Sequence, residues 1–184
     1  TLHQVEEPLL GHWIYTLDYP NHEVESSLNA SLLTVYTDNP NQSFAHRLRL
    51  LDLLLAHDLA GLKDLFQAFF ASIPHQWYDN NPIARYEGYY ASVFYSYFAA
   101  LGLDILLEDA THQGRIDMTV KFRGRIYLFE FKVVELFPDG RALQQIKDRG
   151  YAEKYRALGQ PIHLIGIEFS RAERNIVGFE VETA

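Results

Sequence analysis

The segment YLFEFKVVE, residues 127–135, constrains the fold more than any other part of the sequence. It is rich in aromatic and β-branched residues, which favour a β-strand. Side chains alternate between the two faces of a strand, and both faces of this segment are mainly apolar. We therefore expect a strand that is buried inside a sheet.

Two charged side chains interrupt this apolar strand. Glu130 and Lys132 are two positions apart, so they point to the same face. A buried charge is costly unless it is paired or bound to a metal. One interpretation is an ion pair on a partly exposed face of the strand. The other is that the two side chains carry out chemistry together.

The length of 184 residues fits one domain, or one domain with a smaller helical region. No apolar run approaches the roughly 18–20 residues of a membrane span, so we expect no membrane partner and a cytoplasmic location. The absence of cysteine excludes disulfides and thiolate zinc sites. The chain starts at a threonine without a basic and apolar leader, and we expect a fragment of a longer protein.

The net charge of −8 at first argues against a nucleic-acid partner. The acidity lies mostly in residues 1–83, which carry −7, whereas residues 84–184 carry −1. Residues 121–156 hold nine basic and five acidic side chains. This basic stretch is either a solvated helix face or part of a surface for nucleic acid.

The hydrophobic pattern predicts a helical subregion before residue 80 and an α/β region after it. In the first part, residues 1–44 are irregular apart from a helix at 23–36, and two helices follow at 44–58 and 59–73, with Ser43 as a cap. The second part predicts helices at 84–102 and 138–158 and strands at 103–111, 114–122, 125–134, 161–170 and 174–182. Gly102 is a natural helix stop, and Gly150 is a weak point inside the second helix. The order indicates a mixed sheet that begins with three antiparallel strands and is flanked by helices.

Three acidic side chains stand at unusual positions in this pattern. Glu87 lies on the apolar face of its expected helix, and Asp117 lies inside a strand on the same face as Arg115 and Thr119. Together with Glu130 they offer the oxygen ligands that a hard divalent cation prefers. An adjacent lysine can orient a metal-bound water and stabilise charge that develops on a phosphate.

The run GRIDMTVKFRGRIYLFEFKV, residues 114–133, resembles the core of the PD-(D/E)XK nuclease superfamily. That signature has an Asp on one strand and (D/E)-x-K on the next, which Asp117, Glu130 and Lys132 fill here. The sequence departs from it at Ile116, where the superfamily often has proline. The resemblance implies a restriction-endonuclease-like α-β-β-β-α-β core.

The resemblance also implies a role for each residue of the site. Asp117 and Glu130 would ligate Mg²⁺ or Mn²⁺ with the backbone carbonyl of Phe131, and Lys132 would position the attacking water. Glu87 would either complete the metal site through water or bind a second ion. On the following helix, the residues expected to meet the nucleic acid are Gln144 or Gln145, Lys147 and Tyr151, with Gln144 and Tyr151 on one helix face.

A narrower resemblance covers about residues 12–182. The chain is similar to the C-terminal region of a bacterial family that joins an AAA-type ATPase-like domain to a PD-(D/E)XK domain. It implies that residues 1–80 are a helical subregion or linker after a missing ATPase-like domain, and that residues 81–184 are the nuclease-like domain. No Walker A motif occurs in the sequence, so this chain is not itself the ATPase.

These observations predict a metal-dependent nuclease that hydrolyses DNA, with RNA as an open alternative substrate. The rival hypothesis is an inactive nucleic-acid-binding or protein-interaction module of the same fold, because a fold does not fix a function. The acidic net charge favours the rival, since phosphate neutralisation supplies most non-specific affinity for DNA. The complete set of acids with Lys132 favours the nuclease.

Overall fold

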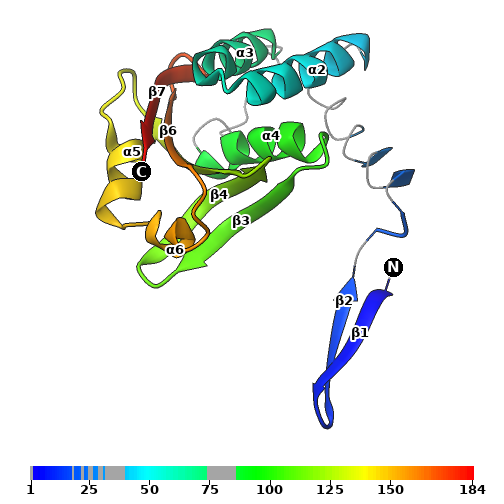
Figure 1. Cartoon of the computed structure of the whole chain (residues 1–184). Helices are drawn as coiled ribbons and strands as arrows, with labels where there is room; N and C mark the ends of the chain where they lie inside the picture. Colours follow the sequence, from blue (N-terminus) through cyan, green and yellow to red (C-terminus); the bar gives the residue numbers. More distant parts are fainter. Residues whose placement is uncertain are drawn as a thin grey trace.

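A computed structural model describes residues 2–17, 19–21, 23, 24, 27, 28, 31, 40–73 and 86–184 of the chain. Its main element is a five-stranded sheet in the order β3-β4-β5-β6-β7 (Figure 1). The strands are β3 (Asp104–Thr111), β4 (Gly114–Phe122), β5 (Arg125–Val134), β6 (Ile162–Ser170) and β7 (Asn175–Thr183). Neighbours are antiparallel except β5 and β6, which are parallel and joined through the helices α5 (Arg141–Asp148) and α6 (Glu153–Arg156).

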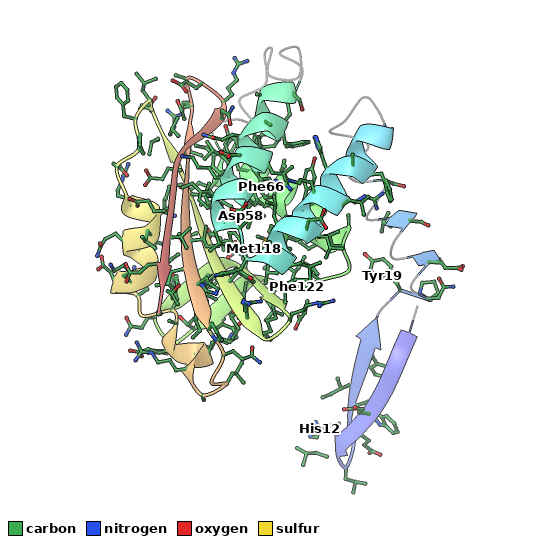
Figure 2. All side chains as sticks on the ribbon, turned by 45° about the horizontal axis from the view of Figure 1, so that its top comes forward. His12, Tyr19, Asp58, Phe66, Met118 and Phe122 are labelled. Atoms are coloured by element: carbon green, nitrogen blue, oxygen red, sulfur yellow. The ribbon has the colours of Figure 1, made fainter. Side chains whose placement is uncertain are left out.

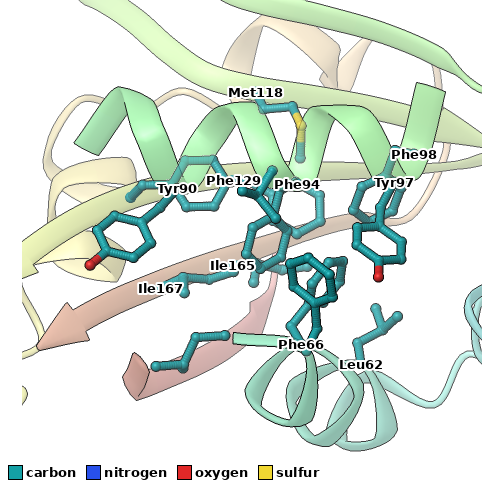
Figure 3. Packing of buried hydrophobic residues seen from close by; sticks show 14 of the residues in the cluster. Leu62, Phe66, Tyr90, Phe94, Tyr97, Phe98, Met118, Phe129, Ile165 and Ile167 are labelled. Atoms are coloured by element: carbon teal, nitrogen blue, oxygen red, sulfur yellow. The ribbon is translucent and has the colours of Figure 1, made fainter. Parts of the chain in front are cut away.

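One face of the sheet is covered by α2 (Pro40–Ala56), α3 (Leu59–Ser72) and α4 (Glu87–Ala99). Aromatic side chains fill the space between these layers (Figure 3). Phe66 of α3 stacks on Phe94 of α4 with ring centroids 3.8 Å apart, and Phe131 of β5 lies 5.1 Å from Phe94. None of the helices in the described ranges is long and apolar enough to cross a membrane.

The opposite face packs against α5 and α6. Ile146 and Tyr155 of these helices meet Leu128 of β5 and Leu164 of β6 in a second core. The three layers confirm the mixed α/β fold and explain why β5 is apolar on both faces. The expected boundary near residue 80 lies within 74–85, outside the described residues, and the helices before it share a core with the sheet after it.

The first residues differ from the expected irregular segment. They form a hairpin of β1 (Leu2–Leu9) and β2 (His12–Leu17), which Figure 1 shows away from the main sheet. The turn contains Gly11 with φ 80°, a conformation that glycine adopts without strain. Irregular pairing near Leu9 weakens the alternation that would have revealed these strands. Most of the helix expected at 23–36 lies outside the described residues.

Two helix boundaries differ from those that the sequence predicts. Helix α2 begins at Pro40, so Ser43 lies inside it and is not its cap. Proline is favoured in the first turn because its missing N–H has no helical partner there. The single helix expected at 138–158 is two, because Gly150 takes φ 56° after α5 ends at Asp148. The next helix, α3, begins as expected, and the Asp58 carboxylate caps it by accepting the Gly61 N–H at 2.8 Å (Figure 2).

A pair of histidines connects the end of α2 to the sheet. The ring of His57 lies 4.3 Å from that of His163, which is buried in β6 beside Tyr127. Burial, together with the charges of His57 and Arg125, lowers the pKa of His163 to about 4. The imidazole therefore stays neutral in the folded protein at pH values where the unfolded chain takes up a proton.

We expect this histidine to make the fold sensitive to acid. The free energy of unfolding should fall as pH drops from 6.5 toward 4, because only the unfolded chain gains a proton at His163 in that window. The loss should be roughly 2 kcal/mol smaller in His163→Gln than in the wild type. Urea unfolding of both proteins at pH 7 and pH 4.5 measures the difference, and equal losses in the two would contradict this account.

Candidate active site

The two central strands separate at the point where Asp117 lies. The last pairing of β4 with β5 toward that end is Met118 with Phe129. Ile116 and Met118 pack into different cores on opposite faces, so the strict alternation expected for β4 breaks at Asp117. The freed N–H of Phe131 donates to Asp117 Oδ2 at 2.8 Å. The splayed strands thus hold the Asp117 carboxylate next to the middle of β5.

Lys132 is in contact with two of the expected metal ligands and lies near a third. Its Nζ donates to Glu130 Oε1 at 2.9 Å and to the Phe131 carbonyl at 3.0 Å, and lies 3.6 Å from Glu87 Oε2. Glu130 is only 1% exposed, so the ion pair is not on an open strand face. Glu87 is the first residue of α4 and is half exposed, and not on the apolar face that its spacing predicted.

The Glu130 carboxylate has two unlike oxygens. Oε1 accepts from Lys132 and also from the side-chain amide of Gln145 on α5. Oε2 is buried and has no hydrogen-bond partner among the described residues. Burial of an oxygen that accepts no hydrogen bond is unfavourable in free energy. Such an oxygen marks a position where a cation or a water molecule can bind.

Burial and mutual repulsion raise the pKa of both Glu130 and Asp117. Burial, followed by the charge of Asp117, raises the pKa of Glu130 to about 7, although Lys132 opposes this shift. Burial also raises the pKa of Asp117, against the Phe131 N–H and the charge of Lys132. Two neighbouring carboxylates have raised pKa values when the positive charge beside them is too small to neutralise both.

The lysine responds in the opposite sense to the same neighbours. Burial opposes its charge, but the hydrogen bond and charge of Glu130, with the charges of Glu87 and Asp117, outweigh burial and raise the pKa of Lys132. Lys132 is therefore an ammonium at neutral pH, which acts as a donor and not as a base.

The other expected site residues lie on α5 or just after it, in different settings. Gln145 donates to Glu130, whereas Gln144 donates to Asp148 at 2.6 Å, so Gln145 is the glutamine that contacts an acid of the site. Lys147 is exposed and its Nζ lies 2.7 Å from Glu182 Oε2. Tyr151 is 2% exposed in the second core and not on α5, so it does not share a helix face with Gln144.

The acidic residue Glu108, which lies near the site, was missed from sequence. Glu108 lies on β3 between Leu107 and Asp109, whose partners on β4 are the two neighbours of Asp117. Its φ of 49° is rare for a residue with a side chain and marks strain beside the site. Glu108, Asp117 and Glu87 line a pocket of about 300 Å³. The pair of acids at 108–109 in an apolar strand was the one available signal.

The residues at the site fit a divalent cation. In the described part of the chain, no three His, Asp or Glu side chains are close enough to form a complete metal cage. The donors that are present are nevertheless hard oxygens, and one of them, Glu130 Oε2, is buried and unpartnered. The Lys132 ammonium contacting Glu130 and the Phe131 carbonyl shows that these oxygens attract positive charge.

The fold and this set of side chains define a restriction-endonuclease-like domain of the nuclease type. A family model described as the PD-(D/E)XK nuclease superfamily matches residues 85–179, more than half of the chain. The chain belongs to this superfamily, whose members generally use divalent metals.

The chain is also similar to a curated bacterial protein. An uncharacterized protein in the vnfD 5′ region of Azotobacter chroococcum mcd 1 is 68% identical over 169 residues. The similarity covers 92% of this chain and 33% of the relative. The chain therefore spans about a third of the length of that protein.

Proposed function

We propose that the chain hydrolyses phosphodiester bonds of DNA in a reaction that depends on Mg²⁺ or Mn²⁺. The observation that carries this proposal is the buried carboxylate of Glu130, which has a pKa of about 7 and shares Lys132 with Glu87. A purely structural ion pair has no need of a second acid, the half-buried Asp117, beside it. Membership of the superfamily supports the same reading.

Acidic side chains and one backbone carbonyl would together hold the cation. Asp117, Glu130 and the carbonyl of Phe131 would bind it, and Glu87 would complete the set through water or a second ion. When bound, the cation supplies charge neutralisation at the phosphate and a water that ionises more easily. The side chains keep these ligands in place before the substrate arrives, because β5 and α5 fix Glu130 from two sides.

Lys132 acts on the substrate as a donor. Its raised pKa keeps the ammonium charged, so it can orient the attacking water and stabilise the charge that grows on the phosphate oxygens. It cannot take a proton from that water in this state. Glu87 lines the pocket and lies 3.6 Å from Nζ, so it holds the ammonium near the pocket lining.

The exposed side of α5 offers groups for the nucleic-acid backbone. Gln144, Lys147 and Arg141 line a pocket of about 370 Å³ that also includes the acids Asp139 and Glu180. We propose Gln144 and Lys147 as backbone contacts, with Lys147 leaving Glu182 to meet a phosphate. Gln145 is assigned to Glu130 instead, and buried Tyr151 is left out of this set.

The context of the domain is part of the proposal. The relative is about three times as long as the matched segment, which leaves room for an upstream domain. We propose that the full-length chain places an ATPase-like domain before residues 81–184 and couples it to cleavage. A cytoplasmic location stays a prediction.

Metal binding should be visible as a gain in stability. A ligand that binds the folded state alone, at 100 times its dissociation constant, adds about 2.7 kcal/mol to the free energy of unfolding. We expect Mn²⁺ to raise the melting temperature of the wild type and to have no effect on Asp117→Asn. Differential scanning fluorimetry with a Mn²⁺ titration measures both, and equal shifts in the two proteins would place any bound metal elsewhere.

Cleavage itself is tested on labelled single-stranded DNA, duplex DNA and RNA with Mn²⁺, with Mg²⁺ and with EDTA. The proposal expects DNA products with either metal and none with EDTA. Cleavage of RNA but not of DNA would mean that the chain is a ribonuclease and not a deoxyribonuclease. A melting shift with Mn²⁺ but no product from any substrate would instead support an inactive binding module.

A further inference from the structure

A glycine and a glutamate on β6 lie beside the two charged residues of β5. In the parallel pairing of these strands, Glu130 neighbours Gly166 and Lys132 neighbours Glu168. Directly paired residues project toward the same face of a sheet. Gly166 and Glu168 therefore lie on the face that α5 covers, next to the active site.

Gly166 allows α5 to approach the sheet closely. A Cβ at this position would lie 2.2 Å from the backbone nitrogen of Leu143 and 2.7 Å from its Cα, which are atoms that cannot turn away. Gly178 on β7 leaves similar room, because a Cβ there would lie 3.1 Å from the Cβ of Glu168. Gly166 therefore allows the short distance between α5 and the sheet, and Gly178 leaves the space for the side chain of Glu168.

Glu168 holds the first turn of α5. The carboxylate is 2% exposed and accepts three backbone N–H groups. Those of Asp139 and Gly140 reach Oε2 at 2.7 and 3.1 Å, and that of Ala142 reaches Oε1 at 3.2 Å. The N-cap of the helix, Gly140, has no side chain to do this. An anion at a helix N-terminus also interacts favourably with the helix dipole.

The same helix carries Gln145, one turn further along. Its amide donates to Glu130 Oε1, so the position of α5 decides whether Glu130 has this donor. We propose that Glu168 is a positioning residue of the active site, which acts through α5 and Gln145 on Glu130. The expected effect of Glu168 on cleavage rests on the proposed function, whereas its expected effect on the position of α5 does not.

The test combines a spectroscopic readout with a double-mutant cycle. Glu168→Gln should move the side-chain amide resonance of Gln145 in a ¹⁵N spectrum and lower kcat about 10-fold, as loss of residues that orient metal ligands commonly does. Gln145→Ala should lower kcat by a similar factor. In the Gln145→Ala background, Glu168→Gln should cost little more, because the two act as one unit.

A matched control separates positioning from stability. Asp58 caps α3 through the Gly61 N–H, far from the site in sequence and on the other face of the sheet. Asp58→Ala should therefore destabilise the protein while leaving the Gln145 resonance and kcat unchanged. If Glu168→Gln does not fold, Glu168→Asp keeps the charge but draws the oxygens back by one methylene, and the same resonance shift is expected.

The outcomes distinguish the inference from the proposed function. A wild type that cleaves nothing would remove the proposed function, while the Gln145 resonance would still report on Glu168. A folded Glu168 variant with an unmoved Gln145 resonance would overturn the positioning role. Equal kcat losses from Glu168→Gln with and without Gln145 would overturn it as well.

Discussion

Replacing Lys132 with methionine is expected to lower the cleavage rate about 10²–10³-fold, the usual cost of removing one donor from a site that stabilises developing charge. Mn²⁺ binding should survive, because Lys132 is not among the proposed ligands. Its ammonium in fact contacts two of them, Glu130 and the Phe131 carbonyl. Single-turnover cleavage and Mn²⁺ titration of the same preparation measure the two effects separately.

A charge-matched control is available on the neighbouring strand. Lys121 on β4 lies near Asp104 at the far end of the strand, and Lys121→Met removes the same formal charge. This variant should cleave at the wild-type rate. Similar losses in the Lys121 and Lys132 variants would mean that overall charge matters, and not the position of the ammonium.

Replacing Glu130 with glutamine is expected to change activity and stability in opposite directions. Glu130→Gln should abolish cleavage, yet raise the free energy of unfolding above pH 7 in the absence of metal. Burial and Asp117 raise the pKa of Glu130 from 4.5 to about 7, so ionising it in the folded protein costs about 3 kcal/mol. Glutamine keeps the shape of the side chain without that charge.

The pH dependence follows from the direction of this shift. Between pH 4.5 and about 7 the folded protein retains the proton on Glu130 while the unfolded chain releases it. The wild type therefore loses stability as pH rises through this window, and Glu130→Gln should not show that part of the loss. Urea unfolding of metal-free protein at pH 5 and pH 8 measures it.

A second buried glutamate provides the control for sign. Glu168 is as buried as Glu130 but is held by three N–H groups, so Glu168→Gln should lower the free energy of unfolding at pH 8. If Glu130→Gln destabilises the protein as Glu168→Gln does, Glu130 is a structural residue and not a ligand held at a cost in stability.

Local sequence pattern predicted the strands around the site better than the ends of the helices. The strand β4 has the bounds that its alternation and turn residues indicate, and the aromatic residues of β5 lie in the core as expected. Gly150 ends α5 early because a left-handed residue stops a helix even where the polar pattern continues. The hairpin at residues 2–17 was missed because irregular pairing obscures its alternation.

The site was predictable where the chemistry is carried by local spacing. Asp117, Glu130 and Lys132 come together as their strands imply. Glu108 and Glu168 were missed because their importance depends on strand pairing, and the parallel neighbour of β5 is set by a crossover some 30 residues long. The break in alternation at Asp117 was also not visible, since it arises where β4 and β5 separate.

The most direct test of the central claim is cleavage of end-labelled DNA with Mn²⁺ by the wild type and by Asp117→Asn. Asparagine keeps an acceptor for the Phe131 N–H, so the fold around β5 should be retained. We expect products from the wild type, none with EDTA, and a rate at least about 10²-fold lower in Asp117→Asn. Equal cleavage by both proteins, or by the wild type in EDTA, would contradict the assignment of this site.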